Sequence, residues 1–282
     1  MNKLQIILSS LGATIVIALF LFGNTVPPKQ PVVMAKDMPA KAKPTIHFSD
    51  LLAKAKQRLT PEQNIRITSL ENSVSRGNVK SQQIDVYKQL ARFWKDSARL
   101  FEPYAYYYGE AAKLESSEKN LTFAAQQFLD KLLVEENSAM QNWLASNAKV
   151  LFEQSLQLNP ANDSSKVGLG ACYMFGGISD NPMQGILPVR EVAQKNPKNI
   201  YAQYILGLGG KKSGQYDKAI ERFLIVVKEK PDNIEATLHL AECYDLKGDK
   251  TNAIKWYMVV KQNITNEDAQ KELTKRIDLL KK

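Results

Sequence analysis

The sequence predicts an all-α protein, in which a solenoid of stacked helix pairs follows one N-terminal transmembrane helix. Two observations predict this fold. The phrase Pro-x-Asn-Ile starts at Pro197 and again at Pro231, 34 positions later, and a fixed period of this size is typical of repeat architectures. Residues 4–22 form an apolar run without a charged side chain. A content of 44% hydrophobic and 24% charged residues over 282 positions excludes wholesale disorder.

The apolar run at residues 4–22 is long enough to cross a membrane. At about 1.5 Å of rise per residue, a helix over this segment spans most of the ~30 Å hydrocarbon core. The apolar region of a secretory signal peptide is shorter, about 7–15 residues, and ends at a small-residue cleavage site. No such site follows Phe22. We therefore expect residues 1–23 to be an uncleaved signal anchor, with a long cleaved signal peptide as the alternative.

Residues 24–44 are rich in proline and lysine and have no apolar periodicity. They predict an extended linker that holds the folded part away from the bilayer. Lys3 favours a cytoplasmic N-terminus, whereas the lysines of the linker favour a cytoplasmic linker, because positive flanks tend to stay inside. We expect a single-pass protein of the inner membrane whose repeats lie in the periplasm, with the cytoplasm as the alternative.

The repeat is clearest when residues 200–233 are aligned with residues 234–267. Gly214 matches Gly248 at a turn, where a left-handed backbone suits glycine, and Phe223 matches Tyr257 in the second helix. A third copy, residues 163–199, is longer by a Gly- and Pro-rich turn at 176–182. Such a turn is the least costly place for an insertion. The same alignment places Tyr173, Gly210 and Tyr244 at one position.

This pattern resembles the tetratricopeptide repeat (TPR), and the chain resembles membrane-anchored bacterial proteins of that family. The resemblance rests on the period, on the Leu-Gly/Ala…Tyr of the first helix, on the glycine turn and on the Ala…Phe/Tyr…Pro of the second helix. It covers residues 163–267 and implies a right-handed α-solenoid. Two positions depart from the family pattern: Gly210 replaces a tyrosine, and Thr265 replaces a proline that would end a helix.

The flanking segments also read as helical. Residues 45–162 predict degenerate helical repeats, with helices starting near Phe48 and Pro61 and continuing over residues 84–100, 104–115, 118–135 and 138–158. Residues 268–282 form an amphipathic stretch with one apolar stripe, which predicts a capping helix, because a terminal repeat needs a polar outer face.

Residue patterns for catalysis are scarce, and we expect no enzyme activity, cofactor, metal site or small-molecule substrate. No phosphate-binding loop, nucleophile elbow or zinc-protease motif occurs. His239, Glu242 and Cys243 share one helical face and could bind a metal or form a thiolate–imidazole pair. However, Cys172 occupies the equivalent repeat position. A cysteine that recurs in this way is more simply a small packing residue.

The formal charge of +9 lies mainly outside the repeats. Residues 1–48 carry five lysines and one acid, and residues 268–282 carry five bases and three acids. Nucleic-acid binding would need clustered cations on one folded face. We therefore do not expect it, although a nucleic-acid or ribonucleoprotein scaffold on the cytoplasmic side remains the alternative function.

The resemblance implies that the first helix of each pair lines a concave face, which binds a partner. The family's peptide-terminus clamp, a lysine and an asparagine at the fifth and ninth repeat positions, is absent. We expect a membrane-tethered adaptor that binds a protein or peptide in this groove, for example during assembly of an envelope complex. The expected concave residues are Tyr201, Tyr204, Leu208, Lys211, Lys212, Glu235, Leu238, Glu242, Asp245 and Leu246.

Overall fold

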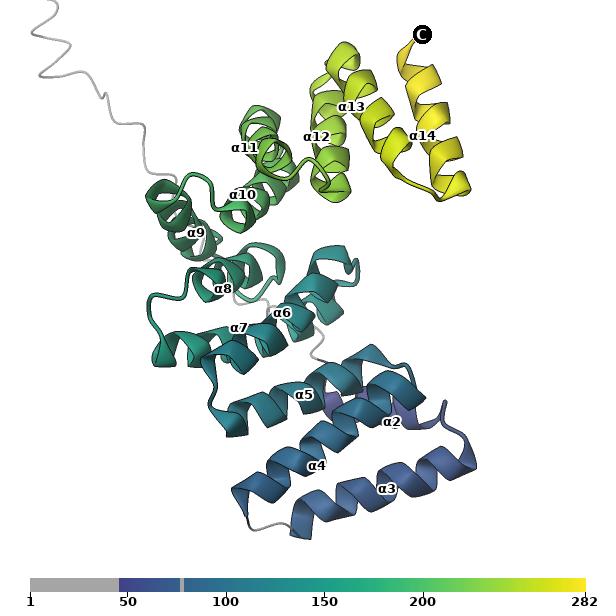
Figure 1. The fold of residues 1–282 in the computed structure, drawn as a ribbon, viewed down its shortest axis with the longest axis vertical. Coiled ribbons are helices and arrows are strands. Elements are labelled where there is room, and N and C mark those ends of the chain that lie inside the picture. The colour runs from purple at the N-terminus through teal and green to yellow at the C-terminus, as the bar shows by residue number, and fades with distance from the viewer. Residues whose placement is uncertain (1–45, 77–78) are drawn as a thin grey trace, which may run out of the picture. The chain divides into compact units, whose positions relative to one another are not determined.

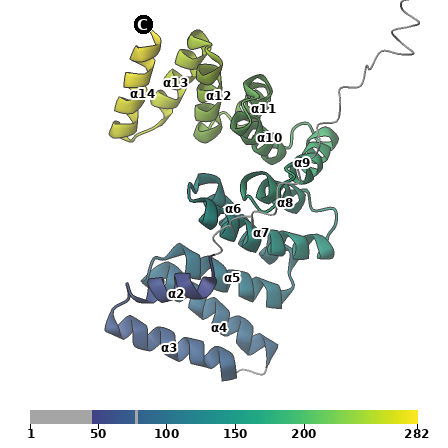
Figure 2. The same ribbon diagram turned by 180° about the vertical axis from the view of Figure 1, so that it is seen from behind.

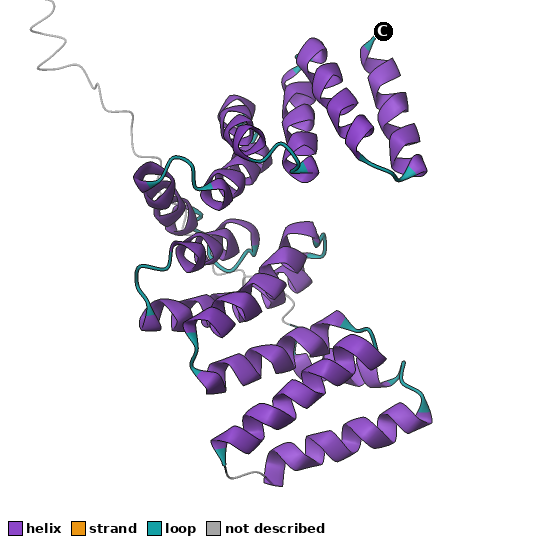
Figure 3. Cartoon of the chain, viewed as in Figure 1, coloured by secondary structure: helices purple, strands orange, loops and turns teal. Residues whose placement is uncertain are grey.

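The computed structural model describes residues 46–76 and 79–282, and within these ranges the chain is helical without strands (Figure 3). These residues belong to one compact unit. The expected anchor at residues 1–23 and the linker at 24–44 lie outside the described residues. None of the described helices combines the length and the apolar character needed to span a bilayer.

The N-terminal half of this unit contains two helix pairs, α4 with α5 and α6 with α7, while α3 packs on α4 and α2 packs on α5 (Figure 1). The start of α3 is a reciprocal capping box: the Gln63 backbone N–H donates to Thr60 Oγ1 at 3.2 Å, and the Thr60 N–H donates to Gln63 Oε1 at 3.0 Å. The bounds are α2 Phe48–Lys56, α3 Pro61–Arg76, α4 Lys80–Arg92, α5 Phe101–Glu115, α6 Glu118–Val134 and α7 Ser138–Leu158.

The C-terminal half contains three further pairs and a final helix, α14, which packs on α13. The three pairs correspond to the three repeats of the sequence, and Gly214 and Gly248 have the left-handed backbone expected of them, with φ of 72° and 87°. The bounds are α8 Asp163–Phe175, α9 Met183–Lys195, α10 Ile200–Lys212, α11 Tyr216–Glu229, α12 Ile234–Lys247, α13 Lys250–Asn263 and α14 Glu267–Leu280.

The Pro-x-Asn-Ile phrase has a direct structural meaning. Asn199 and Asn233 are the N-caps of α10 and α12, and each Oδ1 accepts a hydrogen bond at 2.9 Å from the backbone N–H three residues later. Asn162 caps α8 in the same way. An asparagine at this position satisfies one of the unpaired N–H groups of the first turn. The preceding proline cannot continue the helix before it. The phrase therefore marks the junction between successive pairs.

One element differs from the expectation. We expected one helix over residues 84–100. Instead, α4 ends at Arg92 and a π-helical turn, Phe93–Ser97, follows it directly. Arg99 then adopts a left-handed backbone with φ of 55°. Both Phe93 and Trp94 are almost completely buried. The Ala98 backbone N–H donates to the Phe93 carbonyl at 3.1 Å, and this spacing of five residues is that of a π-helical turn. The expectation of one continuous α-helix was wrong, because the backbone widens into this turn where Phe93 and Trp94 enter the core.

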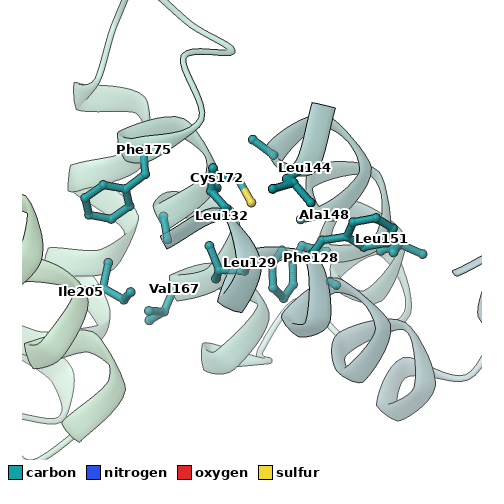
Figure 4. Packing of buried hydrophobic residues seen from close by; sticks show 14 of the residues in the cluster. Phe128, Leu129, Leu132, Leu144, Ala148, Leu151, Val167, Cys172, Phe175 and Ile205 are labelled. Atoms are coloured by element: carbon teal, nitrogen blue, oxygen red, sulfur yellow. The ribbon is translucent and has the colours of Figure 1, made fainter. Parts of the chain in front are cut away.

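The core of the unit runs from pair to pair. Figure 4 shows side chains from α6, α7, α8 and α10 meeting in one cluster, in which Phe128, Leu129, Leu151 and Ile205 are at most 1% exposed. The aromatic side chains of residues 101–108 also pack within the unit: the ring of Tyr106 stacks on Phe48 with 3.5 Å between centroids. The predicted stripe of α14 covers the last pair, since Ile277 is buried against Ala253 and Tyr257.

The first helices of successive pairs also contact one another. Helix α6 contacts α8, α8 contacts α10 and α10 contacts α12, so these four helices form one continuous face of the unit (Figures 1 and 2). The second helices lie behind them. This arrangement brings the ends of α6, α8, α10 and α12 to a shared surface, although they are distant in the sequence.

Candidate functional site

A cavity of about 370 Å³ lies on the face formed by α6, α8, α10 and α12. We call it the groove. Six residues expected to line a concave face do line it: Tyr204, Leu208, Lys211, Lys212, Glu235 and Leu246. His239 also lines the groove, although the sequence analysis considered it only as a metal ligand or catalytic residue and not as part of the concave face.

The rest of the lining comes from helices that the sequence did not assign to the site. Leu132 and Leu133 belong to α6, Gln141 to the first turn of α7 and Phe175 to the end of α8. Adjacent leucines point in different directions on a helix. Leu132 is 1% exposed in the core, whereas Leu133 packs at its edge. The Leu132–Leu133 doublet was the available signal, but the degenerate repeat upstream gave no register that would place it on this face.

Three polar side chains of α10 and α12 interact with one another: Lys211 and His239 line the groove, and Glu242 lies behind them. The Lys211 ammonium pairs with the Glu242 carboxylate and lies 3.1 Å from His239 Nδ1, which is 2.9 Å from Glu242 Oε2. Burial acts to raise the pKa of Glu242, but the hydrogen bonds from His239 and Lys211 outweigh it, and the pKa is lowered. Glu242 therefore stays ionised at neutral pH and orients Lys211 from behind.

The two ends of the groove differ in charge. At one end, Glu235 extends into solvent with 64% of its side chain exposed, beside Tyr204. Burial, together with Glu235, raises the pKa of Tyr204, so its hydroxyl remains protonated. At the other end, the exposed Lys212 ammonium lies 5.3 Å from the centre of the Phe175 ring, within the range of a cation–π interaction. The groove is thus apolar in the middle, acidic at one end and basic at the other.

The remaining expected site residues lie elsewhere. The Tyr201 hydroxyl donates to Gln126 Oε1 at 3.0 Å, and Leu238 packs in the cluster beneath α14. The Asp245 carboxylate accepts two hydrogen bonds of 2.6 Å from Arg276 and one of 3.0 Å from the Tyr257 hydroxyl, and its side chain is only 7% exposed. Asp245 therefore fastens the capping helix, which is a structural task. We leave these three residues out of the candidate site.

The cysteines are placed as packing residues. Cys172 and Cys243 are both fully buried, and burial raises the pKa of both thiols, that of Cys243 to about 11. Such a thiol carries very little thiolate at neutral pH, so Cys243 is a poor nucleophile. Within residues 46–76 and 79–282, no group of three acidic, histidine or cysteine side chains is arranged to hold a metal ion.

Comparison with protein-family models gives no match, and no curated protein matches this chain. Among solved structures, a tetratricopeptide repeat protein from Parabacteroides merdae ATCC 43184 aligns over 83% of this chain and 86% of its own, with 15% identity and a TM-score of 0.53. This chain has a TPR-type repeat fold. Two MamA structures, one of them from Desulfovibrio magneticus RS-1, each align with 19% identity and a TM-score of 0.43. They cover 64% of this chain and 91% and 94% of their own.

Proposed function

We propose that this protein is a membrane-tethered scaffold that binds a segment of a partner protein in the groove. The observation that supports this proposal is the composition of the groove, to which the first helices of four successive pairs in a TPR-type fold contribute apolar side chains. Leu133, Leu208 and Leu246 provide most of this apolar surface, and the edge of Phe175 adds to it. A segment that buries its own apolar side chains against such a surface gains about 25 cal/mol for each Å² removed from water.

Charge gives the bound segment a direction. Glu235 at one end favours a positively charged residue, and Lys212 at the other favours a negatively charged one. Lys211 is already compensated by Glu242 and contributes its aliphatic stem and hydrogen bonds rather than a free charge. Like-charge contacts would penalise the reversed orientation. We therefore infer a partner segment with apolar residues in its middle and opposite charges at its two ends.

Two leucines of nearly equal exposure provide a matched test. Leu246 is 55% exposed and lines the groove, whereas Leu279 is 57% exposed on α14, away from it. Leu246→Asp is expected to weaken partner binding by at least about tenfold, because it places a carboxylate on an apolar contact surface. Leu279→Asp is expected to bind normally. A photo-crosslinking residue at position 208 of the full chain, expressed in its own cells, would measure binding as the yield of crosslinked adduct.

The crosslinking result can contradict the proposal in two ways. An adduct that forms equally well when the photo-crosslinking residue is moved to position 279 would not depend on the groove. An adduct whose yield survives Leu246→Asp would show that the apolar surface at Leu246 does not hold the partner, which contradicts the proposed binding mode. Circular dichroism of both aspartate variants would show that a lost adduct does not reflect unfolding.

The tether and the side of the membrane form a separate part of the proposal. They are supported by the uncharged run at residues 4–22, and we place the repeats on the periplasmic side of the inner membrane. Alkaline phosphatase fused after Lys282 is expected to be active, because this reporter requires the oxidising periplasm. An inactive phosphatase fusion, together with a fluorescent cytoplasmic reporter at the same position, would place the repeats in the cytoplasm.

A further inference from the structure

A second cavity, of about 360 Å³, lies between α9 and the α10–α11 pair, away from the groove. We call it the inter-repeat cavity. None of its lining residues is shared with the groove, and it involves none of the residues proposed above to bind a partner. Its lining consists of Met174, Ile186, Arg190, Ala193, Gln194, Leu206, Gly209, Gly210, Ser213, Gln215, Lys218, Glu221 and Arg222.

The cavity coincides with a missing tyrosine. Gly210 occupies the repeat position of Tyr173 and Tyr244. Each of these tyrosines lies between its own pair and the preceding one: an added Cβ at Gly185 of α9 would lie 3.0 Å from Tyr173 Cβ, Tyr173 also interacts with the charge of Lys149 of α7, and Tyr244 packs on the clusters around Ile220 of α11 and Ala253 of α13. Gly210 lies close to Ala219 of α11, where an added Cβ would come to 3.2 Å, and it lines the cavity on the side that faces α9. Helix α9 accordingly packs less extensively on α10 than α7 does on α8 or α11 does on α12.

The floor of the cavity is apolar and adaptable. Ile186, Ala193 and Leu206 line it, and the Met174 side chain reaches over Gly209, where an added Cβ would lie 2.3 Å from the Met174 terminal methyl. Methionine is flexible and polarisable, and sulfur makes favourable contacts with aromatic rings. An incoming aromatic side chain could therefore take the space beside Gly210 while the thioether of Met174 adjusts around it.

The rim of the cavity is basic. Arg190, Lys218 and Arg222 carry three positive charges, against one negative charge on Glu221. Lys218 donates to Gln215 Oε1 at 2.7 Å and Arg222 donates to Gln203 Oε1 at 2.8 Å. Among the residues that the structure describes, no carboxylate forms an ion pair with any of the three cations. Four other lysines of the repeats, Lys166, Lys198, Lys211 and Lys247, do pair with acids, whereas the three cations of this rim leave their positive charge available to a ligand.

We propose that the inter-repeat cavity is a second docking site, which takes an aromatic side chain from an acidic segment of a partner protein. The aromatic ring fills the volume that the repeat tyrosine occupies in the neighbouring pairs. Acidic residues on either side of that ring pair with Arg190, Lys218 and Arg222. Aromatic side chains in pockets ringed by such contacts are typical of the residues that dominate interface energies. With two sites on different faces, the scaffold could hold two partner segments at once.

A methyl NMR titration of the full chain, with detergent present throughout, tests this directly. The protein contains seven methionines, whose labelled methyl groups give separate signals, and the Met174 signal is assigned from a Met174→Leu variant. The probe is a blocked peptide of sequence EDYED, and the controls are EDAED and KKYKK. The EDYED peptide is expected to shift the Met174 signal saturably. The control peptides are expected to bind at least about tenfold more weakly, because one lacks the ring and the other reverses the charge.

Variants of the rim and the floor separate docking from unspecific attraction. Arg190→Glu combined with Lys218→Glu is expected to weaken EDYED binding at least about tenfold, and added salt should weaken binding to the unchanged protein. Lys228→Glu, on the same helix as Lys218 but outside the cavity, should bind EDYED normally. Gly210→Tyr restores the repeat tyrosine and should abolish binding by filling the cavity. If Gly210→Tyr fails to fold, the rim variant still decides the result.

Several outcomes would overturn the proposal. The Met174 signal could fail to shift, EDAED or KKYKK could bind as well as EDYED, or a folded Gly210→Tyr variant could keep its affinity. An equal shift on adding a short oligouridylate would assign the basic rim to nucleic acid instead. Leu246→Asp is expected to leave EDYED binding intact, so failure of the groove and failure of this cavity remain distinguishable.

Discussion

Phe223→Ala is expected to lower the free energy of unfolding by about 3–5 kcal/mol. Phe223 is fully buried between the second and third repeats, in a cluster that includes Ala236 and Leu240 of α12. The backbone of Gly207 lies against its ring, since a Cβ there would approach the ring to 2.7 Å. Truncation leaves a cavity that the two helix pairs can close only by shifting against each other, and this adds to the lost transfer energy.

The same substitution should also impair the groove. The Phe223 ring centre lies 6.0 Å from that of Tyr204 and 5.6 Å from that of His239, so it supports two residues of the groove wall from behind. Leu224→Ala is the matched control, because Leu224 follows directly on α11 and is 38% exposed. We expect Leu224→Ala to lower the free energy of unfolding by about 0.5 kcal/mol or less. Urea unfolding monitored by circular dichroism measures the stability of both variants. Equal unfolding midpoints for Phe223→Ala and Leu224→Ala would contradict this role of Phe223.

Gly185→Ala is expected to destabilise the protein by about 1–3 kcal/mol, although alanine favours helices over glycine. Gly185 in α9 faces Gly170 in α8, and an alanine Cβ at position 185 would lie 2.2 Å from the Gly170 carbonyl oxygen. The obstacle is backbone, which cannot rotate away as a side chain can. The two helices of the first repeat would have to separate, and the floor of the inter-repeat cavity, which includes Met174 and Ile186, would be disturbed.

A glycine in an equally helical setting gives the opposite result. Gly109→Ala in α5 would place its Cβ 3.4 Å from Leu151 Cδ1 and 3.7 Å from Phe128 Cε2, which are ordinary contacts. We expect Gly109→Ala to raise the free energy of unfolding by about 0.5–1 kcal/mol, because alanine favours the helix over glycine. Thermal unfolding of both variants would show shifts of opposite sign. A Gly185→Ala melting temperature at or above that of the unchanged protein would show that α8 and α9 are not in close contact.

The helical elements were accessible to sequence reasoning because their signals are local. The Asn199 and Asn233 caps and the Gly214 and Gly248 turns depend on backbone conformations that particular residue types favour. The break at residues 93–99 was not accessible in this way. Its apolar spacing fits an α-helix, and the π-helical turn becomes visible only in the tertiary structure, where Phe93 and Trp94 enter the core.

The candidate site was only partly accessible. Repeat register predicted one shared face for Tyr204, Leu208 and Glu235, since equivalent positions of a repeat face the same way, and the three residues line the groove together. It also placed Asp245 there, but the capping helix brings Arg276 to that carboxylate, which no periodicity within the repeat can indicate. Leu133 and Phe175 were missed because their helices reach the groove through packing between pairs rather than through the repeat motif.

The sequence by itself determined that this chain consists of repeated helix pairs, because helix periodicity, caps and turns are properties of short segments. It also showed that Gly210 breaks the tyrosine pattern. Only the tertiary structure decided what these features enclose. The groove and the inter-repeat cavity are bounded by residues far apart in the chain, and their shape depends on how closely each pair packs on the next. A missing side chain becomes a cavity only when the neighbouring helix does not move in to fill the space.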